Sequence, residues 1–120
     1  MKTQYLTQLP ESWLPIAAVF SALGDATRQK ILLLFEPGEE LSIKNIADSF
    51  NFSRTSIVHH LAVLEKAGIL AVRRSGKMAL YSVRYESVLE ALQSLRLYIE
   101  DDLAGRNTGG EDVKGSAGGQ

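Results

Sequence analysis

The stretch "SIKNIADSFNFSRTSIVHHLAVLEKAGIL" (residues 42–70) predicts two short helices joined by a tight turn. Ser42 is placed to cap the first of these helices, which we expect over about residues 43–49. Ser53 is placed to cap the second, over about residues 54–67, and a glycine follows at the position where helices commonly end. Two short helices connected in this way form a helix-turn-helix.

The flanking sequence predicts three more helices and a β-hairpin. Apolar residues recur at helical spacing over about residues 12–23, 26–36 and 85–104. The segments "ILAVRR" and "MALYSV" flank the turn "SGK", which indicates a hairpin. The expected fold class is therefore mainly α with a small β-hairpin, a winged helix-turn-helix of about five helices and a two-stranded wing.

The chain divides into a domain and a tail. We expect residues 1–104 to form one winged helix-turn-helix domain with terminal dimerisation helices. Six of the ten glycines lie in residues 105–120, where Val113 is the one aliphatic residue larger than alanine. Such a segment buries too little apolar surface to offset the entropy of ordering, so we expect a flexible tail rich in glycine.

The composition excludes several kinds of chemistry. The 120 residues include no cysteine, which removes disulfides, thiolate metal sites and thiol nucleophiles. No set of nucleophile, base and acid is visible, so we expect no enzyme activity. No apolar run approaches the roughly 18 residues that span a bilayer, and "MKTQYLTQLPESW" lacks the apolar stretch of a secretory signal. We expect a cytoplasmic protein without a membrane partner.

The charge of the chain is concentrated in its middle. The net charge is −1, but residues 54–84 carry six Lys or Arg residues against Glu65 alone, which gives +5. Such a block is typical of nucleic-acid contact, and a solvated surface is the alternative. Arg73, Arg74 and Lys77 gather near the tip of the expected hairpin, from which they could reach phosphates or the minor groove.

The second helix of the helix-turn-helix has two distinct faces. Ile57, Leu61 and Leu64 follow the i, i+4, i+7 spacing of a buried stripe. The opposite face has no acidic residue and combines cations with small and hydrogen-bonding side chains, which suits the major groove of DNA. Its members are Arg54, Thr55, Val58, His59, Ala62 and Lys66.

His59 and His60 are the two histidines of the chain. Neighbouring residues on a helix diverge by about 100°, so they do not form the i, i+4 pair that binds a metal. With no cysteine and no third histidine, we assign no metal site and no cofactor. We expect His59 to face the groove rather than to be merely solvated. We expect His60 to be packed against the core, with a hydrogen bond to nearby backbone.

Three segments together resemble the ArsR/SmtB family of bacterial winged-helix repressors: "LGDATRQKILLLF", "LSIKNIADSFNFSRTSIVHHLAVLEKAGIL" and "VRRSGKMALYSV". The resemblance implies a homodimer, joined through its first and last helices, that binds an inverted-repeat operator in double-stranded DNA at its own promoter. By matching position, it implies that the DNA-binding residues are Ser53, Arg54, Thr55, Ser56, Val58, His59, Arg73, Arg74 and Lys77. Asp25, Thr27 and Arg28 match the "GD-x-TR" signature, which we interpret as capping and packing.

The chain departs from the family in its sensing residues. Many members carry a Cys-x-Cys metal site in the segment equivalent to "LSIKNIADSF", and others have His ligands on the last helix; this chain has neither. A small-molecule inducer stays an open alternative, with a pocket between the first and last helices lined by Trp13, Phe20, Leu92 and Tyr98. The last helix carries more apolar residues than one partner needs, which favours a homodimer. A winged-helix module that binds protein and no DNA is the alternative function.

Overall fold

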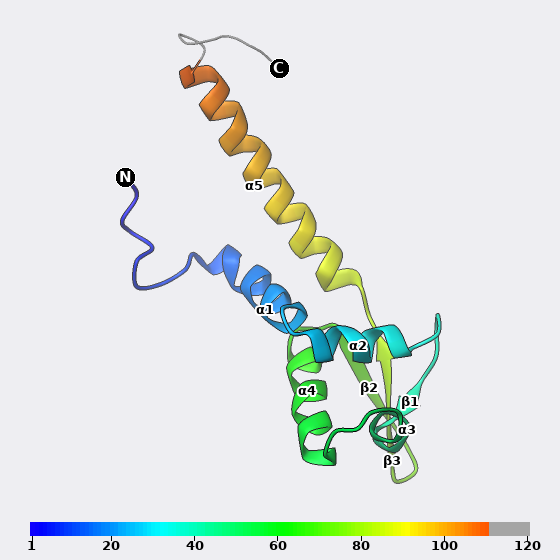
Figure 1. Ribbon diagram of the computed structural model, residues 1–120. Coiled ribbons are helices and arrows are strands. Elements are labelled where there is room, and N and C mark those ends of the chain that lie inside the picture. The colour runs from blue at the N-terminus through cyan, green and yellow to red at the C-terminus, as the bar shows by residue number, and fades with distance from the viewer. Residues whose placement is uncertain (111–120) are drawn as a thin grey trace.

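The structure, a computed structural model, describes residues 1–110, and the remainder of the expected tail, residues 111–120, lies outside the described residues. Figure 1 shows the shorter helices and a small sheet gathered in one body, from which the long last helix projects. The fold class is confirmed as mainly helical with a winged helix-turn-helix. In chain order, the elements over residues 1–110 are η1 (Glu11–Trp13), α1 (Leu14–Leu23), α2 (Ala26–Leu34), β1 (Leu41–Ser42), α3 (Ile43–Ser49), α4 (Arg54–Lys66), β2 (Leu70–Ser75), β3 (Met78–Val83) and α5 (Glu86–Gly110).

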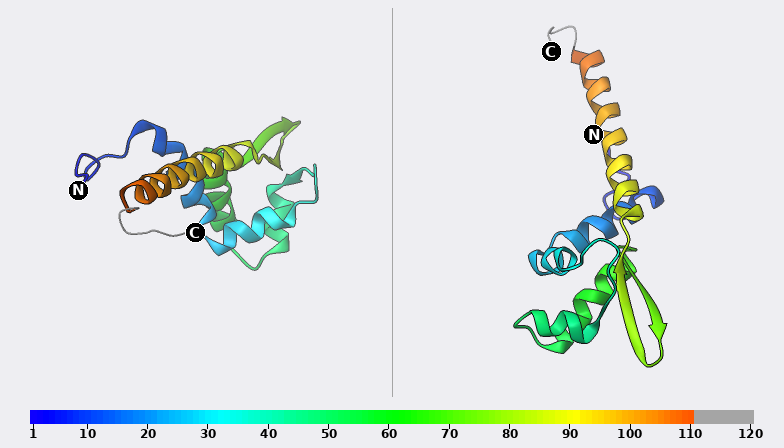
Figure 2. Two further views of the ribbon diagram at one scale, coloured as in Figure 1. Left: turned by 90° about the horizontal axis from the view of Figure 1, so that it is seen from above. Right: turned by 90° about the vertical axis from the view of Figure 1, so that its right-hand side faces the viewer.

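The expected hairpin is formed by β2 and β3. Ser75 pairs with Met78, so the connection is a two-residue turn, and Gly76 at its first position has a φ of +62°. A positive φ at that position is the pattern of a type II′ turn, which glycine adopts without strain. The right-hand view of Figure 2 shows this wing and the helix-turn-helix at the end of the molecule opposite to the free end of α5.

A third strand, β1, was not expected from the sequence. It pairs antiparallel with β3, with Leu41 opposite Tyr81, and completes a sheet in the order β1-β3-β2. Two residues are too few to show the alternation by which a strand is recognised. Ser42 belongs to this strand and also caps α3, which is the role its position in the sequence indicates.

The core lies where α1, α2, α3 and α4 meet the inner face of the sheet. Ile57, Leu61 and Leu64, the expected buried stripe of α4, are at most 1% exposed. Every residue that is buried in the described part of the chain is apolar or is Tyr81, so the hydrophobic effect dominates the stability of this body. The other buried residues are Ile16, Val19, Ala22, Ile31, Leu32, Ile46, Ile69, Leu70 and Ala91.

Side-chain caps fix the starts of three helices. Asp25 accepts a hydrogen bond from the backbone N–H of Arg28 at the start of α2, and this bond is the main cause that lowers the pKa of the Asp25 carboxyl. Ser42 forms a capping box with Asn45, and Ser53 accepts from the backbone N–H of Ser56, the third residue of α4. These bonds satisfy N–H groups that have no partner inside a helix.

Gly68 ends α4 in the way the sequence predicts. Its φ is +78°, the Gly68 N–H donates to Glu65 O, and the Ile69 N–H donates to Leu64 O, both at 2.9 Å. These are the two hydrogen bonds of a Schellman motif. The motif turns the chain sharply from α4 into β2, and so determines how the wing leaves the helix.

The bounds of α1 and α2 differ slightly from the expected ones. Residues 11–13 form a separate 3-10 turn, and α1 begins at Leu14 with Pro15 in its first turn, where a proline needs no N–H partner. α2 ends at Leu34 rather than at Glu36. Glu36 precedes a proline, and the residue before proline disfavours the helical region.

The last helix continues beyond its expected end at Ala104 and reaches Gly110. Residues 105–110, which we assigned to the tail, are therefore helical in the structure. Arg106 donates to Asp102 at 2.7 Å, an i, i+4 ion pair that favours helix past the first glycine. Over residues 1–110, no helix is both long enough and apolar enough to cross a membrane.

Candidate nucleic-acid interface

The first two turns of α4 present the residues that were expected to read DNA. Arg54, Thr55, Val58 and His59 are exposed, and Val58 is 41% accessible. Figure 1 shows that α4 and the wing reach the same end of the molecule. A helix and a hairpin side by side at one end match the arrangement in which a helix enters a groove and a wing contacts the adjacent backbone.

Ser53 and Ser56 are engaged within the chain. The hydroxyl of Ser53 accepts from the backbone N–H of Ser56 at 3.1 Å, so one of its acceptor positions is occupied by the cap. The side chain of Ser56 is half-buried, whereas Thr55 beside it is exposed. Of the expected contact residues at this end of α4, Arg54 and Thr55 are the more accessible to a ligand.

The two histidines point in different directions. His59 is exposed and His60 is half-buried, and their ring centroids lie 5.7 Å apart. The prediction that His60 forms a hydrogen bond with nearby backbone is wrong. Instead, Nδ1 of His60 lies 3.2 Å from Nη1 of Arg28 in α2. Among the described residues no group of three or more His, Asp or Glu side chains is placed to hold a metal ion.

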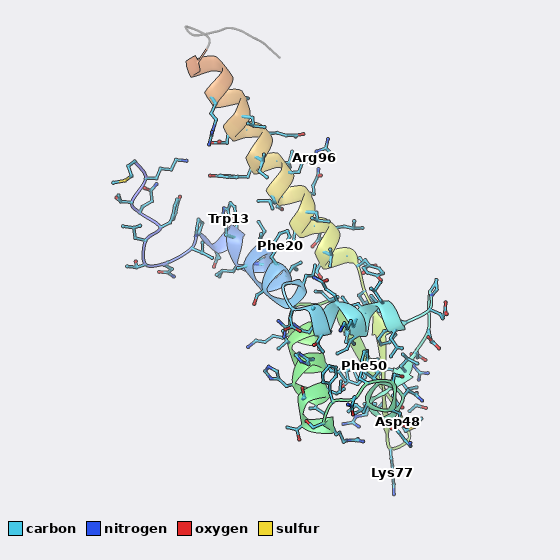
Figure 3. The ribbon with its side chains drawn as sticks, viewed as in Figure 1. Trp13, Phe20, Asp48, Phe50, Lys77 and Arg96 are labelled. Atoms are coloured by element: carbon cyan, nitrogen blue, oxygen red, sulfur yellow. The ribbon has the colours of Figure 1, made fainter. Side chains whose placement is uncertain are left out.

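Lys77 lies at the tip of the wing. Figure 3 shows its side chain extending from the turn away from the body. Arg73 pairs with Leu80 and Arg74 pairs with Ala79, so the two arginines point to opposite faces of the sheet. Arg74 lies on the face that packs against the helices and Arg73 on the outer face, which separates two cations that the sequence places side by side.

Arg73 is held by an acidic residue, Glu40, whose sequence context gives no sign of this contact. Its Nε donates to Glu40 Oε2 at 2.6 Å and its Nη2 donates to Glu40 Oε1 at 2.8 Å. The hydrogen bond from Arg73 is the main cause that lowers the pKa of the Glu40 carboxyl. Since Glu40 directly precedes the unexpected strand β1, the sequence pattern contained no signal that would bring it to the wing.

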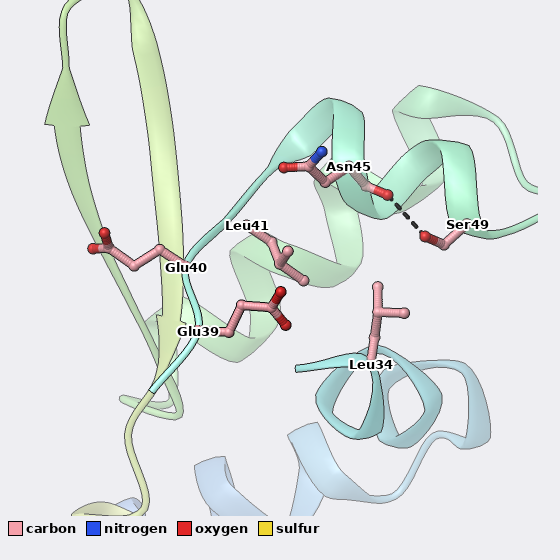
Figure 4. Close-up of a pocket in the computed structure, with 6 residues that line it drawn as sticks. All are labelled: Leu34, Glu39, Glu40, Leu41, Asn45 and Ser49. Carbon is pink, nitrogen blue, oxygen red and sulfur yellow. Dashed lines mark hydrogen bonds between the residues drawn. The ribbon is translucent and has the colours of Figure 1, made fainter. Parts of the chain in front are cut away.

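A pocket of about 400 Å³ lies beside this ion pair, between the end of α2 and the start of α3 (Figure 4). Its polar groups already have partners in the chain. Glu40 binds Arg73, Glu39 accepts from the backbone N–H of Glu36, and Ser49 donates to the carbonyl of Asn45. The pocket therefore contributes acidic oxygens beside the wing and offers no cation to a phosphate.

A second pocket, of about 380 Å³, lies where the N-terminal segment meets α5. Trp13 and Tyr98 both line it, and their rings meet edge to face with centroids 5.1 Å apart. Two of the four residues expected to line an inducer pocket are thus brought together. Phe20 and Leu92 do not line this pocket.

Comparison with known proteins identifies the class. The family model of a helix-turn-helix domain matches residues 23–73. The transcriptional repressor SdpR of Bacillus subtilis is 42% identical over 65 residues, which cover 54% of this chain and 71% of SdpR. An uncharacterized HTH-type transcriptional regulator of Methanocaldococcus jannaschii is 32% identical over 83 residues, which cover 69% of this chain and 93% of that protein.

Solved structures agree with this fold. An ArsR-like transcriptional regulator from a Rhodococcus species superposes with a TM-score of 0.78 at 20% identity, over 89% of this chain and all of that one. A structure described as a possible transcriptional regulator for arsenical resistance superposes with a TM-score of 0.56 at 27% identity, over 72% and 92% of the two chains. The fold is that of a winged helix-turn-helix regulator. The chain belongs to the ArsR family, whose proteins are transcriptional regulators rather than enzymes.

Proposed function

We propose that this protein is a homodimeric, sequence-specific DNA-binding regulator that represses its own operon from an inverted-repeat operator. The observation that carries this proposal is the exposure of Arg54, Thr55, Val58 and His59 on α4, at the end of the molecule that also carries Lys77. The recognition helix supplies contacts to base edges, and the wing supplies contacts to phosphates. SdpR, a relative, is named a repressor, and this supports repression as the mode of regulation.

The proposed dimer rests on the apolar surface of the terminal helices. Leu92, Ile99 and Leu103 of α5 are 48%, 46% and 51% exposed, and they follow one face of the helix at i, i+7 and i+11 spacing. Leu14 and Phe20 of α1 are also exposed, at 53% and 37%. Apolar side chains exposed in such a row require a partner, and a second copy with two-fold symmetry can bury the same row on both chains.

The two-fold axis of the proposed dimer determines the form of the operator. Two copies of α4 would enter successive major grooves on one side of the DNA, so the half-sites would be inverted and separated by about one helical turn. The N-terminal segment and α5 form the pocket that contains Trp13 and Tyr98, and this pocket is where a small-molecule inducer would bind close to the dimer face.

The test of the function is an unbiased selection of DNA from a random pool by the purified protein, followed by sequencing. The proposal expects an enriched inverted repeat, and it fails if no sequence is enriched at low salt. Capture of a protein without any DNA enrichment would indicate the protein-binding alternative.

The dimer has its own test in sedimentation equilibrium of Ile99→Glu, which places a charge within the apolar row. We expect this variant to be a monomer and the control Glu100→Gln, one residue along on the same helix, to stay a dimer. A monomeric wild-type protein would contradict the proposed dimer.

A further inference from the structure

The guanidinium of Arg28 joins three helices. Arg28 belongs to α2, and its Nε donates to Ala22 O at 2.7 Å while its Nη2 donates to Ser21 O at 3.1 Å. Both carbonyls lie in the last turn of α1, and Ser21 O also accepts from the backbone N–H of Gly24 at 3.3 Å. The third nitrogen, Nη1, lies 3.2 Å from Nδ1 of His60 in α4. One side chain therefore links the end of α1 to the helix that we propose reads DNA.

The chemistry of the two groups fixes the direction of the bond between them. A guanidinium has N–H donors and no acceptor, so Nδ1 of His60 must accept. The hydrogen bond therefore requires the tautomer that carries its proton on Nε2. A hydrogen bond from a charged donor is stronger and more sensitive to geometry than a contact between neutral groups. Protonation of Nδ1 would remove the acceptor and place two cations side by side.

Apolar packing sets which face of α4 meets the core. Ile57 and Leu61 are buried there, and a hydrogen bond adds a contact with a defined direction to this packing. A hydrogen bond is lost when donor and acceptor turn away from each other. His59, the next residue to His60, lies on the exposed face of α4. A small rotation of α4 that broke the bond to Arg28 would also turn this exposed face.

We propose that Arg28 is a positioning residue for DNA recognition, which holds α4, through Nδ1 of His60, in one rotation relative to the end of α1. This inference rests on the proposed function, because it takes α4 as the helix that reads DNA. It has a consequence for the terminal helices. Trp13, just before α1, contacts Tyr98 of α5, so the proposal expects a shift of this helix pair to affect α4 through the Arg28 guanidinium.

Gln29 supplies a matched control. Its Nε2 donates to Leu23 O at 2.6 Å, so it also caps the last turn of α1 from α2, but no hydrogen bond to α4 is found for it among the described residues. Gln29→Ala removes a cap of α1, whereas Arg28→Met removes the caps and the link to His60 and keeps an apolar stem. If Arg28 only capped α1, the two variants would have similar operator affinities.

The experiment measures operator affinity and thermal unfolding for both variants, and for His60→Leu and His60→Asn. We expect Arg28→Met and His60→Leu each to bind the selected operator about tenfold more weakly, the size expected for one charged hydrogen bond. The double variant should lose no more than either single one. His60→Asn, whose amide oxygen replaces Nδ1 as acceptor, should recover most of the affinity. Gln29→Ala should lower the unfolding temperature and leave operator affinity near that of the wild type.

Two results would overturn the inference: His60→Leu binding the operator as the wild type does, or Arg28→Met and Gln29→Ala giving equal affinities. If Arg28→Met does not fold, the operator affinities of His60→Leu and His60→Asn still show whether the acceptor at position 60 supports DNA binding. A long-range ¹H–¹⁵N spectrum of the wild type gives a test without DNA, in which an unprotonated Nδ1 is expected and a protonated Nδ1 would refute the contact. If the wild type selects no operator, the proposed function fails, and the spectrum still reports on Arg28 and His60.

Discussion

Arg73 and Glu40 form a two-point ion pair across the outer face of the wing sheet, with N–O distances of 2.6 and 2.8 Å. Arg73 lies on β2, and Glu40 lies next to β1 at the opposite edge of the sheet, so the pair spans the central strand β3. A guanidinium held in this way has two of its five N–H donors engaged, and its charge is balanced by a carboxylate. The pair therefore opposes the DNA contact that the resemblance assigns to Arg73.

Glu40→Gln should bind DNA more tightly than the wild type. The substitution removes the competing charge and frees Arg73, so we expect affinity to rise for operator and random DNA alike. The slope of log affinity against log salt should steepen by about one unit for one added phosphate contact. Fluorescence anisotropy over a series of salt concentrations measures both quantities.

Glu39→Gln is the control for that variant. Glu39 carries the same charge one residue away, but its carboxylate accepts from the backbone N–H of Glu36 and makes no hydrogen bond to Arg73. Because net charge changes equally in both variants, a larger effect at Glu40 is due to the ion pair. Equal effects at the two positions would show that the ion pair with Glu40 does not limit DNA binding.

The same pair predicts a dependence on pH. The hydrogen bond from Arg73 lowers the pKa of Glu40 below its ordinary value of 4.5. A lowered carboxyl pKa means that the stabilising contribution is complete above pH 4.5 and is lost as the pH falls through the folded-state pKa. An NMR titration of the Glu40 side-chain carboxyl carbon should give a midpoint below 4.5 in the wild type and a higher midpoint in Arg73→Ala. A wild-type midpoint at or above 4.5 would contradict the ion pair.

Two glycine-to-alanine variants should change stability in opposite directions. Gly68 has a φ of +78°, and an added Cβ would lie 3.3 Å from the Ser87 hydroxyl, so we expect Gly68→Ala to destabilise the fold by about 1–2 kcal/mol. Gly105 lies inside α5, where an added Cβ meets nothing within 4 Å. Gly105→Ala should stabilise by about 0.5–1 kcal/mol. Chemical denaturation measures the change in the free energy of unfolding for each variant. Changes of the same sign would contradict the backbone conformation assigned to one of the two glycines.

His59→Ala and Arg74→Ala should affect DNA binding in different ways. His59 is exposed on the proposed base-reading face, so its removal should change the preference at one base pair of each half-site by about 1 kcal/mol. Arg74 is an exposed cation of the wing, and under the proposed function its removal should weaken binding to all sequences and reduce the salt slope by about one unit. Titration against a panel of single-base operator variants separates the two patterns. If His59→Ala lowered the affinity for all operator variants equally, His59 would not take part in base readout.

The sequence predicted the parts of the fold that rest on local signals. Ser42, Ser53 and Gly68 mark helix ends through caps and a positive φ, and the structure confirms each of them. The buried stripe of α4 follows from its helical period alone. These features depend on residues within a few positions of one another, which is why a single sequence contains enough information to place them.

The parts that the sequence did not predict depend on contacts between distant segments. Glu40 reaches Arg73 only because the two-residue strand β1 pairs with β3, and a strand of that length has no pattern of its own. His60 was expected to bond to nearby backbone, whereas its partner is Arg28, 32 positions away along the chain. The continuation of α5 past Gly105 is supported by the ion pair between Asp102 and Arg106. In each case, the tertiary structure or a side-chain pair outweighs local propensity.

The central claim, sequence-specific DNA binding through α4 and the wing, is tested most directly by the ratio of two affinities. The selected operator and a scrambled duplex of the same length and composition are titrated by anisotropy between about 50 and 200 mM salt. We predict that the operator binds about a thousandfold more tightly or better and that both affinities fall as salt rises. Equal affinities for the two duplexes across this range would contradict the claim.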